Sequence, residues 1–135
     1  MIRRLRGRAR SSRGTTLVET ALSMVPWLLL TFGIVDGGRL LFEYSVVSNA
    51  AREGVRWAAV RGQASGREAS RDDVKAYVRS LALGLDVQPD VQFIPDNKQG
   101  STVQVTVTHN FTPAMGLFTT AAIPLRSSSQ MLFAR

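Results

Sequence analysis

An uninterrupted apolar run over residues 17–35 is the feature of this sequence that most limits its possible folds. The run contains nineteen residues, and Glu19 is the single charged residue within it. At about 1.5 Å of rise per residue, a helix of this length nearly crosses the roughly 30 Å hydrocarbon core of a bilayer. No comparable apolar surface elsewhere in the sequence would bury such a helix in a soluble core. We therefore predict a transmembrane helix over residues 15–36.

The charges on either side of the run predict its orientation. Six of the seventeen basic residues lie before residue 14, with no acidic residue among them. Removing those six leaves eleven basic against ten acidic residues, a net charge of +1. The positive-inside rule then keeps the N-terminus cytoplasmic and places residues 37–135 outside the cytoplasm. The arginines could instead bind nucleic acid, but they abut a membrane helix and lack interleaved aromatic residues, so we expect no nucleic-acid partner.

Residues suited to catalysis or metal binding are scarce. The chain has no cysteine and one histidine, His109. These counts exclude a disulfide framework and leave no pair of imidazoles for a zinc site. No P-loop, G-x-S-x-G, H-E-x-x-H or EF-hand pattern is present. We expect a protein that is not an enzyme and binds no cofactor or metal, with His109 as a polar strand residue.

Glu19 is the unusual residue of the apolar run. A carboxylate at the centre of a membrane helix costs about 2.5–3.5 kcal/mol, and less near the end, so it usually has a partner. The side chain of Glu19 could reach back to the membrane interface and to the arginines before residue 14. It could instead meet a charge on another molecule. The residues alone leave both possibilities open.

The segment around Glu19 resembles the processing site of type IV pilins and pseudopilins. It reads RGTTLVE over residues 13–19. In that family a prepilin peptidase cuts after a glycine that follows a basic leader, and a glutamate is the fifth residue of the mature chain. The resemblance implies a cut between Gly14 and Thr15, which makes residues 1–14 a leader. It also implies that Glu19 pairs with the new α-ammonium of a neighbouring subunit, so that two charges in an apolar environment neutralise each other.

Further matches make the resemblance closest to the TadE-like family, the minor pilins or pseudopilins of the tight-adherence (Tad/Flp) pilus. They are PWLLL over residues 26–30, GR over 38–39 and AAREGVR over 50–56. One departure is Thr20, where an aromatic residue often follows the glutamate. The resemblance implies a subunit that acts in pilus assembly and adhesion. An unprocessed, single-pass scaffold of a pilus or secretion apparatus is the alternative.

The same resemblance implies partners and a location. The partners are a prepilin peptidase, other pilin or pseudopilin subunits and an inner-membrane assembly platform. The location is the bacterial inner membrane, with entry into a surface pilus if the subunit is assembled.

Three residues of the apolar helix bear on how it packs. Pro26 removes one backbone hydrogen bond and crowds the preceding turn, so we expect a kink there. Gly33 and Gly37 form a G-x-x-x-G pattern, which lets helices approach closely. The two glycines could equally ease the helix into the outer interface.

Hydrophobic periodicity predicts the remaining elements. The long helix continues to residue 61, with Glu43 among the residues away from its core-facing stripe and Gly54 placed for close packing on the sheet. A capping box of Ser70 and Asp73 begins a short helix that ends near Gly84. Strands follow over residues 91–95, 102–111 and 123–133. The predicted core-facing stripe of the long helix is Leu40, Tyr44, Val47, Ala51, Val55 and Ala58.

The predicted fold is therefore α+β and pilin-like. A long N-terminal transmembrane helix packs, together with a short helix, on a small three-stranded antiparallel sheet. The expected organisation is a leader over residues 1–14, a membrane helix over 15–36 and an extracytoplasmic domain over 37–135.

Overall fold

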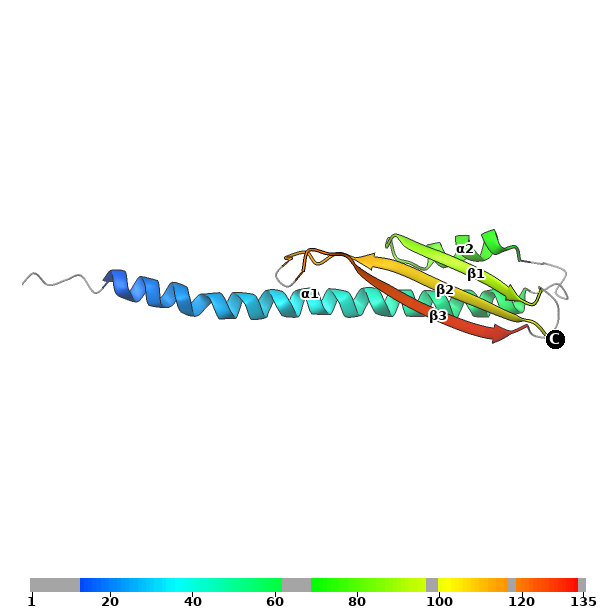
Figure 1. Cartoon of the computed structure of the whole chain (residues 1–135), viewed down its shortest axis with the longest axis horizontal. Helices are drawn as coiled ribbons and strands as arrows, with labels where there is room; N and C mark the ends of the chain where they lie inside the picture. The colour runs from blue at the N-terminus through cyan, green and yellow to red at the C-terminus, as the bar shows by residue number, and fades with distance from the viewer. Residues whose placement is uncertain (1–12, 62–68, 97–99, 117–118, 134–135) are drawn as a thin grey trace, which may run out of the picture. The chain divides into compact units, whose positions relative to one another are not determined.

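The computed structural model describes residues 13–61, 69–96, 100–116 and 119–133. Within them the chain forms helix α1 (Arg13–Val60), helix α2 (Arg71–Ser80) and strands β1 (Val87–Ile94), β2 (Thr102–Phe111) and β3 (Ile123–Leu132) (Figure 1). Residues 1–35 and 36–135 are two compact units. We call residues 14–35 the stem and residues 36–135 the sheet unit. Helix α1 contributes to both. The predicted leader lies almost wholly outside the described residues.

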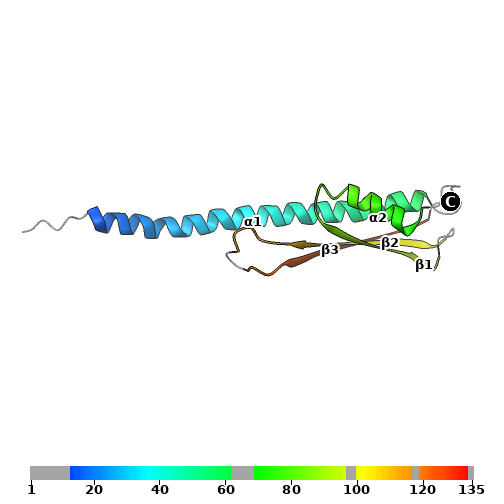
Figure 2. The same ribbon diagram turned by 90° about the horizontal axis from the view of Figure 1, so that it is seen from above.

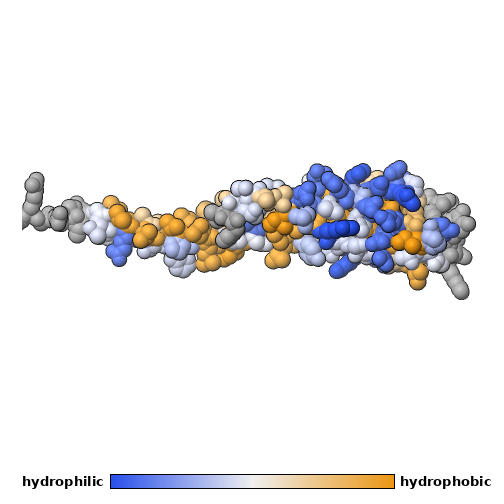
Figure 3. Space-filling model, in the orientation of Figure 1, coloured by the Kyte–Doolittle hydropathy of each residue, from blue (hydrophilic) through white to orange (hydrophobic). Residues whose placement is uncertain are grey.

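The stem is helical throughout and exposes its apolar side chains, as Figure 3 shows. Helix α1 is long and apolar enough to cross a membrane, and its most apolar stretch has no part buried within the chain. The hydroxyls of Thr20, Ser23 and Thr31 donate to carbonyl oxygens four residues earlier, at 2.8, 2.9 and 2.8 Å. These bonds satisfy polar groups that lipid could not. The helix continues through Pro26, and the kink expected there stays a prediction.

The sheet is antiparallel with strand order β1-β2-β3. Val91 of β1 faces Val105 of β2, which faces Ser129 of β3. Strand β2 has the predicted bounds, and β3 ends one residue before the predicted end. Strand β1 begins at residue 87, four residues before the predicted start. The extension includes Pro89, which β1 tolerates because it is an edge strand of the sheet.

The core lies between the sheet and the two helices, which cover the same face of it (Figure 2). Small residues let α1 approach closely. A Cβ atom added at Gly54 would lie 2.5 Å from Val78 Cγ2 of α2 and 3.5 Å from Val105 Cγ1 of β2. The expected close packing at Gly54 is confirmed, with α2 nearer than the sheet. The buried residues of α1 that share this core are Val47, Ala50, Ala51, Val55, Ala58 and Ala59.

Two predictions about α1 side chains were wrong. Tyr44, predicted to face the core, is 46% exposed, and Glu43, predicted to lie elsewhere around the helix, is only 8% exposed. The buried line runs from Glu43 through Val47 to Ala50, at spacings of four and three residues, which keeps these positions on one helix face. A carboxylate is tolerated on that face because it has partners, described below.

Helix α2 begins as predicted and ends earlier. Ser70 Oγ accepts from the Asp73 N–H at 3.2 Å, and the Ser70 N–H donates to Asp73 Oδ2 at 3.0 Å, which completes the capping box. The helix stops at Ser80 rather than near Gly84, and residues 81–84 form a turn. The α+β class, with its long helix, short helix and three-stranded antiparallel sheet, is confirmed.

Candidate functional site

The predicted processing residues lie in the first turn of α1. Gly14 and Thr15 are exposed, and a Cβ atom at Gly14 would meet no described atom within 4 Å. The first N–H groups of a helix lack intrahelical partners, so a terminal turn opens more readily than an interior one. A peptidase could therefore reach the bond between the two residues. Whether it does so stays a prediction.

Glu19 lies one helical turn after Thr15. Its side chain is exposed and has no hydrogen-bond or ionic partner among the described residues, although its carbonyl oxygen accepts from Ser23 Oγ at 2.9 Å. The leader arginines, which could neutralise it from the same chain, lie outside the described residues. Within the described part of the chain, no cation neutralises the carboxylate of Glu19 in the apolar stem.

The two glycines of the G-x-x-x-G pattern lie in different units and are considered one by one. Gly33 is half-buried in the stem. Gly37 is exposed in the sheet unit, and a Cβ atom there would meet no described atom within 4 Å. Packing within the described chain therefore gives no reason for a glycine at residue 37. Pro26 is exposed as well.

A ladder of alternating charges begins the sheet unit. Arg39 lies 3.6 Å from Asp36 and 3.3 Å from Glu43, measured from guanidinium nitrogen to carboxylate oxygen. These are the i,i+3 and i,i+4 spacings of helix ion pairs. Glu43 Oε2 continues the ladder to His109 Nε2 of β2, at 3.0 Å. We call Asp36, Arg39, Glu43 and His109 the charge ladder.

The Glu43–His109 contact joins α1 to β2. The second ring nitrogen of His109, Nδ1, lies 2.7 Å from the carbonyl oxygen of Asp86. Both ring nitrogens therefore face oxygen atoms. His109 is thus held between Glu43 of α1 and the carbonyl group of Asp86, the residue before β1.

Asp36 also binds the connection between β2 and β3. Its two carboxylate oxygens accept from the backbone N–H groups of Ala114, at 3.1 Å, and Met115, at 3.2 Å. Arg39, which neutralises Asp36, lies with its guanidinium carbon 5.5 Å from the ring centroid of Phe111. The first turns of α1 in the sheet unit therefore hold both the end of β2 and the chain that follows it.

Sequence reasoning missed the bond of this ladder to β2. The spacing of Asp36, Arg39 and Glu43 along the helix is visible in the sequence, but His109 was expected only as a polar strand residue. One signal was available for Glu43, since it lies four residues before the core residue Val47 and so shares its face. The sequence offers no comparable signal for the bond across to β2, because residues 43 and 109 are brought together by the tertiary fold.

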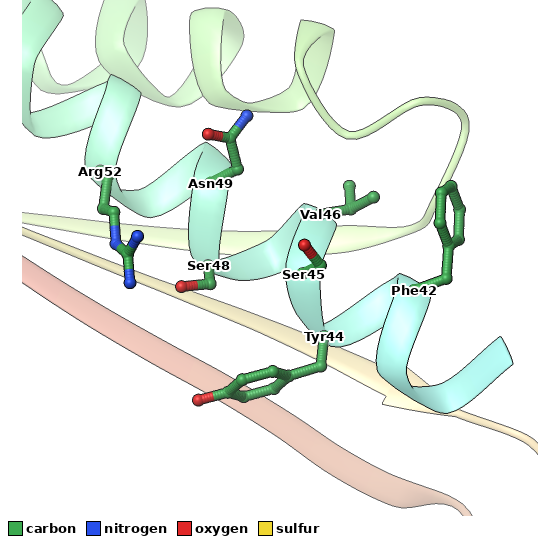
Figure 4. Close-up of a pocket in the computed structure, with 7 residues that line it drawn as sticks. All are labelled: Phe42, Tyr44, Ser45, Val46, Ser48, Asn49 and Arg52. Carbon is green, nitrogen blue, oxygen red and sulfur yellow. The ribbon is translucent and has the colours of Figure 1, made fainter. Parts of the chain in front are cut away.

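The described residues form no cluster of metal-ligating side chains. No group of three histidine, aspartate or glutamate side chains among them could hold a metal ion. An open groove on α1 is lined by neutral side chains and one arginine, with no acid–base pair (Figure 4). Its lining residues are Phe42, Tyr44, Ser45, Val46, Ser48, Asn49 and Arg52.

Comparison with known proteins bears on the N-terminal part of the chain. A family model described as TadE-like protein matches residues 14–56. The match covers the predicted processing residues, the stem and the α1 members of the charge ladder. It confirms the resemblance found in the sequence. No curated protein and no solved structure matched the chain.

Proposed function

From the premise that residues 14–56 are those of a TadE-like protein, we propose that the chain is a minor pilin or pseudopilin of a Tad (tight-adherence) type IV pilus. The family match and the long apolar helix fit a pilus-associated membrane protein. The finer assignment rests on one observation. An exposed apolar stem carries a carboxylate, Glu19, without a partner among the described residues, one turn after a Gly14–Thr15 bond in an exposed helix end.

In this proposal the stem first crosses the inner membrane, with the leader in the cytoplasm and residues 37–135 outside. A prepilin peptidase removes residues 1–14 and creates an α-ammonium group on Thr15. That cation pairs with Glu19 of a neighbouring subunit when stems pack together, which removes two charges from the apolar environment at once. Gly33 and Gly37 let the packed helices approach closely, and Pro26 shapes the stem.

The role is structural rather than catalytic. The subunit works with other pilins and with the inner-membrane assembly platform, in pilus assembly and adhesion, and it uses no cofactor. The sheet unit is the part that stays outside the bundle of stems.

Processing is tested by expressing the chain with and without its prepilin peptidase and measuring the intact mass. We expect residues 1–14 to be lost, with Thr15 as the new N-terminus, only in the strain that has the peptidase. A Gly14→Leu variant should keep its leader. Gly38→Ala is the matched control, because that glycine is also exposed with no described atom near its Cβ position. The same mass in both strains would refute processing.

Subunit pairing is tested with Glu19→Gln, which keeps the side-chain shape and removes the charge. We expect normal cleavage and a strong loss from sheared surface filaments, because an amide cannot neutralise the ammonium of its neighbour. Full incorporation of the variant would exclude the pairing role.

Fractionation of the unaltered chain separates the proposal from the scaffold alternative. A scaffold stays with the inner membrane, whereas a pilin subunit also appears in the sheared material.

A further inference from the structure

The connection between β2 and β3 has an unusual composition for an exposed segment. Residues 112–122 contain no charged side chain, and most are apolar or small. Of the described residues in this connection, Ala114, Thr120, Ala121 and Ala122 are exposed, and Met115 is 47% exposed. An uncharged apolar stretch held at the surface indicates a site of contact with an apolar medium or a partner.

Asp36 determines where this connection lies. Its carboxylate holds the N–H groups of Ala114 and Met115, at 3.1 and 3.2 Å. Asp36 is the first residue after the apolar run 17–35. Ala114 and Met115 are therefore held next to the residue at which α1 leaves its membrane-length apolar segment.

We propose that the β2–β3 connection, at Ala114 and Met115 where Asp36 holds it, lies in the interfacial region of the bilayer that the stem crosses, as a second membrane contact of the same chain. This inference rests on the proposed membrane insertion of the stem. It goes further by assigning a lipid-binding role to a segment of the sheet unit. The contact sets the orientation of the sheet unit on the membrane before assembly.

The chemistry of the segment suits an interfacial position. Backbone N–H groups near the hydrocarbon need partners within the protein, and Asp36 supplies them for Ala114 and Met115. The charge of Asp36 is itself balanced by Arg39, at 3.6 Å. The connection brings no charge that lipid would have to desolvate, and its apolar side chains supply contact area with the headgroup–acyl boundary.

The position favours lipid over a protein partner. A surface held at the end of a membrane span meets lipid headgroups in every subunit that has not yet been assembled. A soluble partner would have to displace those headgroups to reach it. The contact area is small, so the contact is reversible and the connection can leave the bilayer together with the stem.

The absence of cysteine makes a direct test possible. The full chain is reconstituted in vesicles of phosphatidylethanolamine and phosphatidylglycerol, with a polarity-sensitive fluorophore on one introduced cysteine. Met115→Cys reports on the connection. Leu132→Cys is the matched control, since this apolar residue is 65% exposed at the far end of β3. Leu29→Cys reports on insertion of the stem. Each label is quenched either by iodide, present on both sides, or by brominated lipid.

We expect iodide to quench the Met115→Cys label several-fold less than the Leu132→Cys label, and brominated lipid to quench the former selectively. Equal iodide quenching at the two positions, with the Leu29→Cys label quenched by lipid, would overturn the inference and leave stem insertion intact. Shielding of the Met115→Cys label from both quenchers would show a protein cover and also overturn it. Failure of lipid to quench the Leu29→Cys label would refute membrane insertion, and the inference would fall with it.

Asp36 acts here as a positioning residue. In Asp36→Ala the connection loses its anchor, and we expect the iodide quenching of the Met115→Cys label to rise towards that of the Leu132→Cys label. The Leu29→Cys label should not change. Asp36→Asn keeps an acceptor oxygen and should restore part of the shielding. Unchanged shielding in Asp36→Ala would exclude Asp36 as the anchor that holds the connection in the bilayer.

Discussion

Helix α1 passes through two surroundings, and its side chains differ in size between them. In the stem the large apolar residues are exposed, among them Leu22 at 73% and Trp27 at 71%. In the sheet unit most buried positions of the same helix are small, including Ala51, Gly54 and Val55. Large side chains occur where no described part of the chain covers the helix, and small ones occur where the sheet and α2 approach it.

The difference shows that apolar content alone does not specify what covers a helix. A stripe of small residues indicates a close protein neighbour, because only small side chains let a sheet approach. Large apolar residues around the whole circumference indicate lipid or a bundle of like helices. Since apolar surface in water costs roughly 25 cal/mol per Å², the stem requires one of these two media.

The largest contrast is expected from truncating one aromatic residue in each region. Phe111→Ala should lower the free energy of unfolding of the sheet unit by about 3–5 kcal/mol, because a fully buried ring is replaced by a cavity. Trp27→Ala should leave it unchanged, since that ring is exposed in the stem. Hydrogen exchange of the sheet amides in the full chain, in detergent micelles, measures both. Equal effects would contradict the division of the helix into two surroundings.

Two of the carboxylates of α1, Glu19 and Glu43, provide the next contrast. His109→Ala should destabilise the sheet unit by about 1.5–3 kcal/mol, because Glu43 loses a hydrogen bond to a polar partner while it stays buried. A double-mutant cycle with Glu43→Gln measures how much of this loss belongs to the pair. Glu19→Gln is the control, and it should alter assembly without altering the stability of the sheet unit. Additive effects of Glu43→Gln and His109→Ala would show that the two side chains are not coupled.

Two glycines of α1 should respond to alanine with opposite signs. Gly54→Ala places a methyl group against Val78 and should destabilise the sheet unit by about 1–3 kcal/mol through overpacking. Gly38→Ala meets no described atom within 4 Å and should stabilise the helix by up to about 1 kcal/mol, since alanine loses less backbone entropy. Thermal unfolding of the full-length variants measures both. A stabilising Gly54→Ala would contradict the close contact of α1 with α2.

Elements fixed by local signals were predictable from the sequence. The ends of β2 follow from strict alternation, and the start of α2 follows from the capping box of Ser70 and Asp73. Elements decided by tertiary context were not. Strand β1 can extend across Pro89 because it is an edge strand, and Tyr44 is exposed because the sheet covers the neighbouring face of α1.

The candidate site divides in the same way. The order of leader, Gly14, Glu19 and apolar run is contiguous, so the sequence alone could suggest a processing and pairing role. The bonds from Glu43 to His109 and from Asp36 to Met115 join residues more than sixty positions apart. Such bonds leave no periodic signal in a single sequence, and the structure was needed to find them.

The smallest effect is expected at the start of α2. An exposed local contact stabilises the helix there, whereas burial stabilises the part of α1 in the sheet unit. The pKa of Asp73 is lowered from its ordinary value of 3.8, first by the side-chain hydrogen bond of Ser70 and then by the Ser70 backbone N–H. Its stabilising contribution is therefore present above about pH 3.8 and lost as the pH falls through the lower folded-state pKa. Ser70→Ala removes the larger cause, so the pKa of Asp73 should rise towards its ordinary value in an NMR titration of the carboxyl carbon. Ser80→Ala, at the other end of the helix, should leave the pKa of Asp73 unchanged. If Ser70→Ala left it unchanged as well, the hydroxyl would not be the source of the shift.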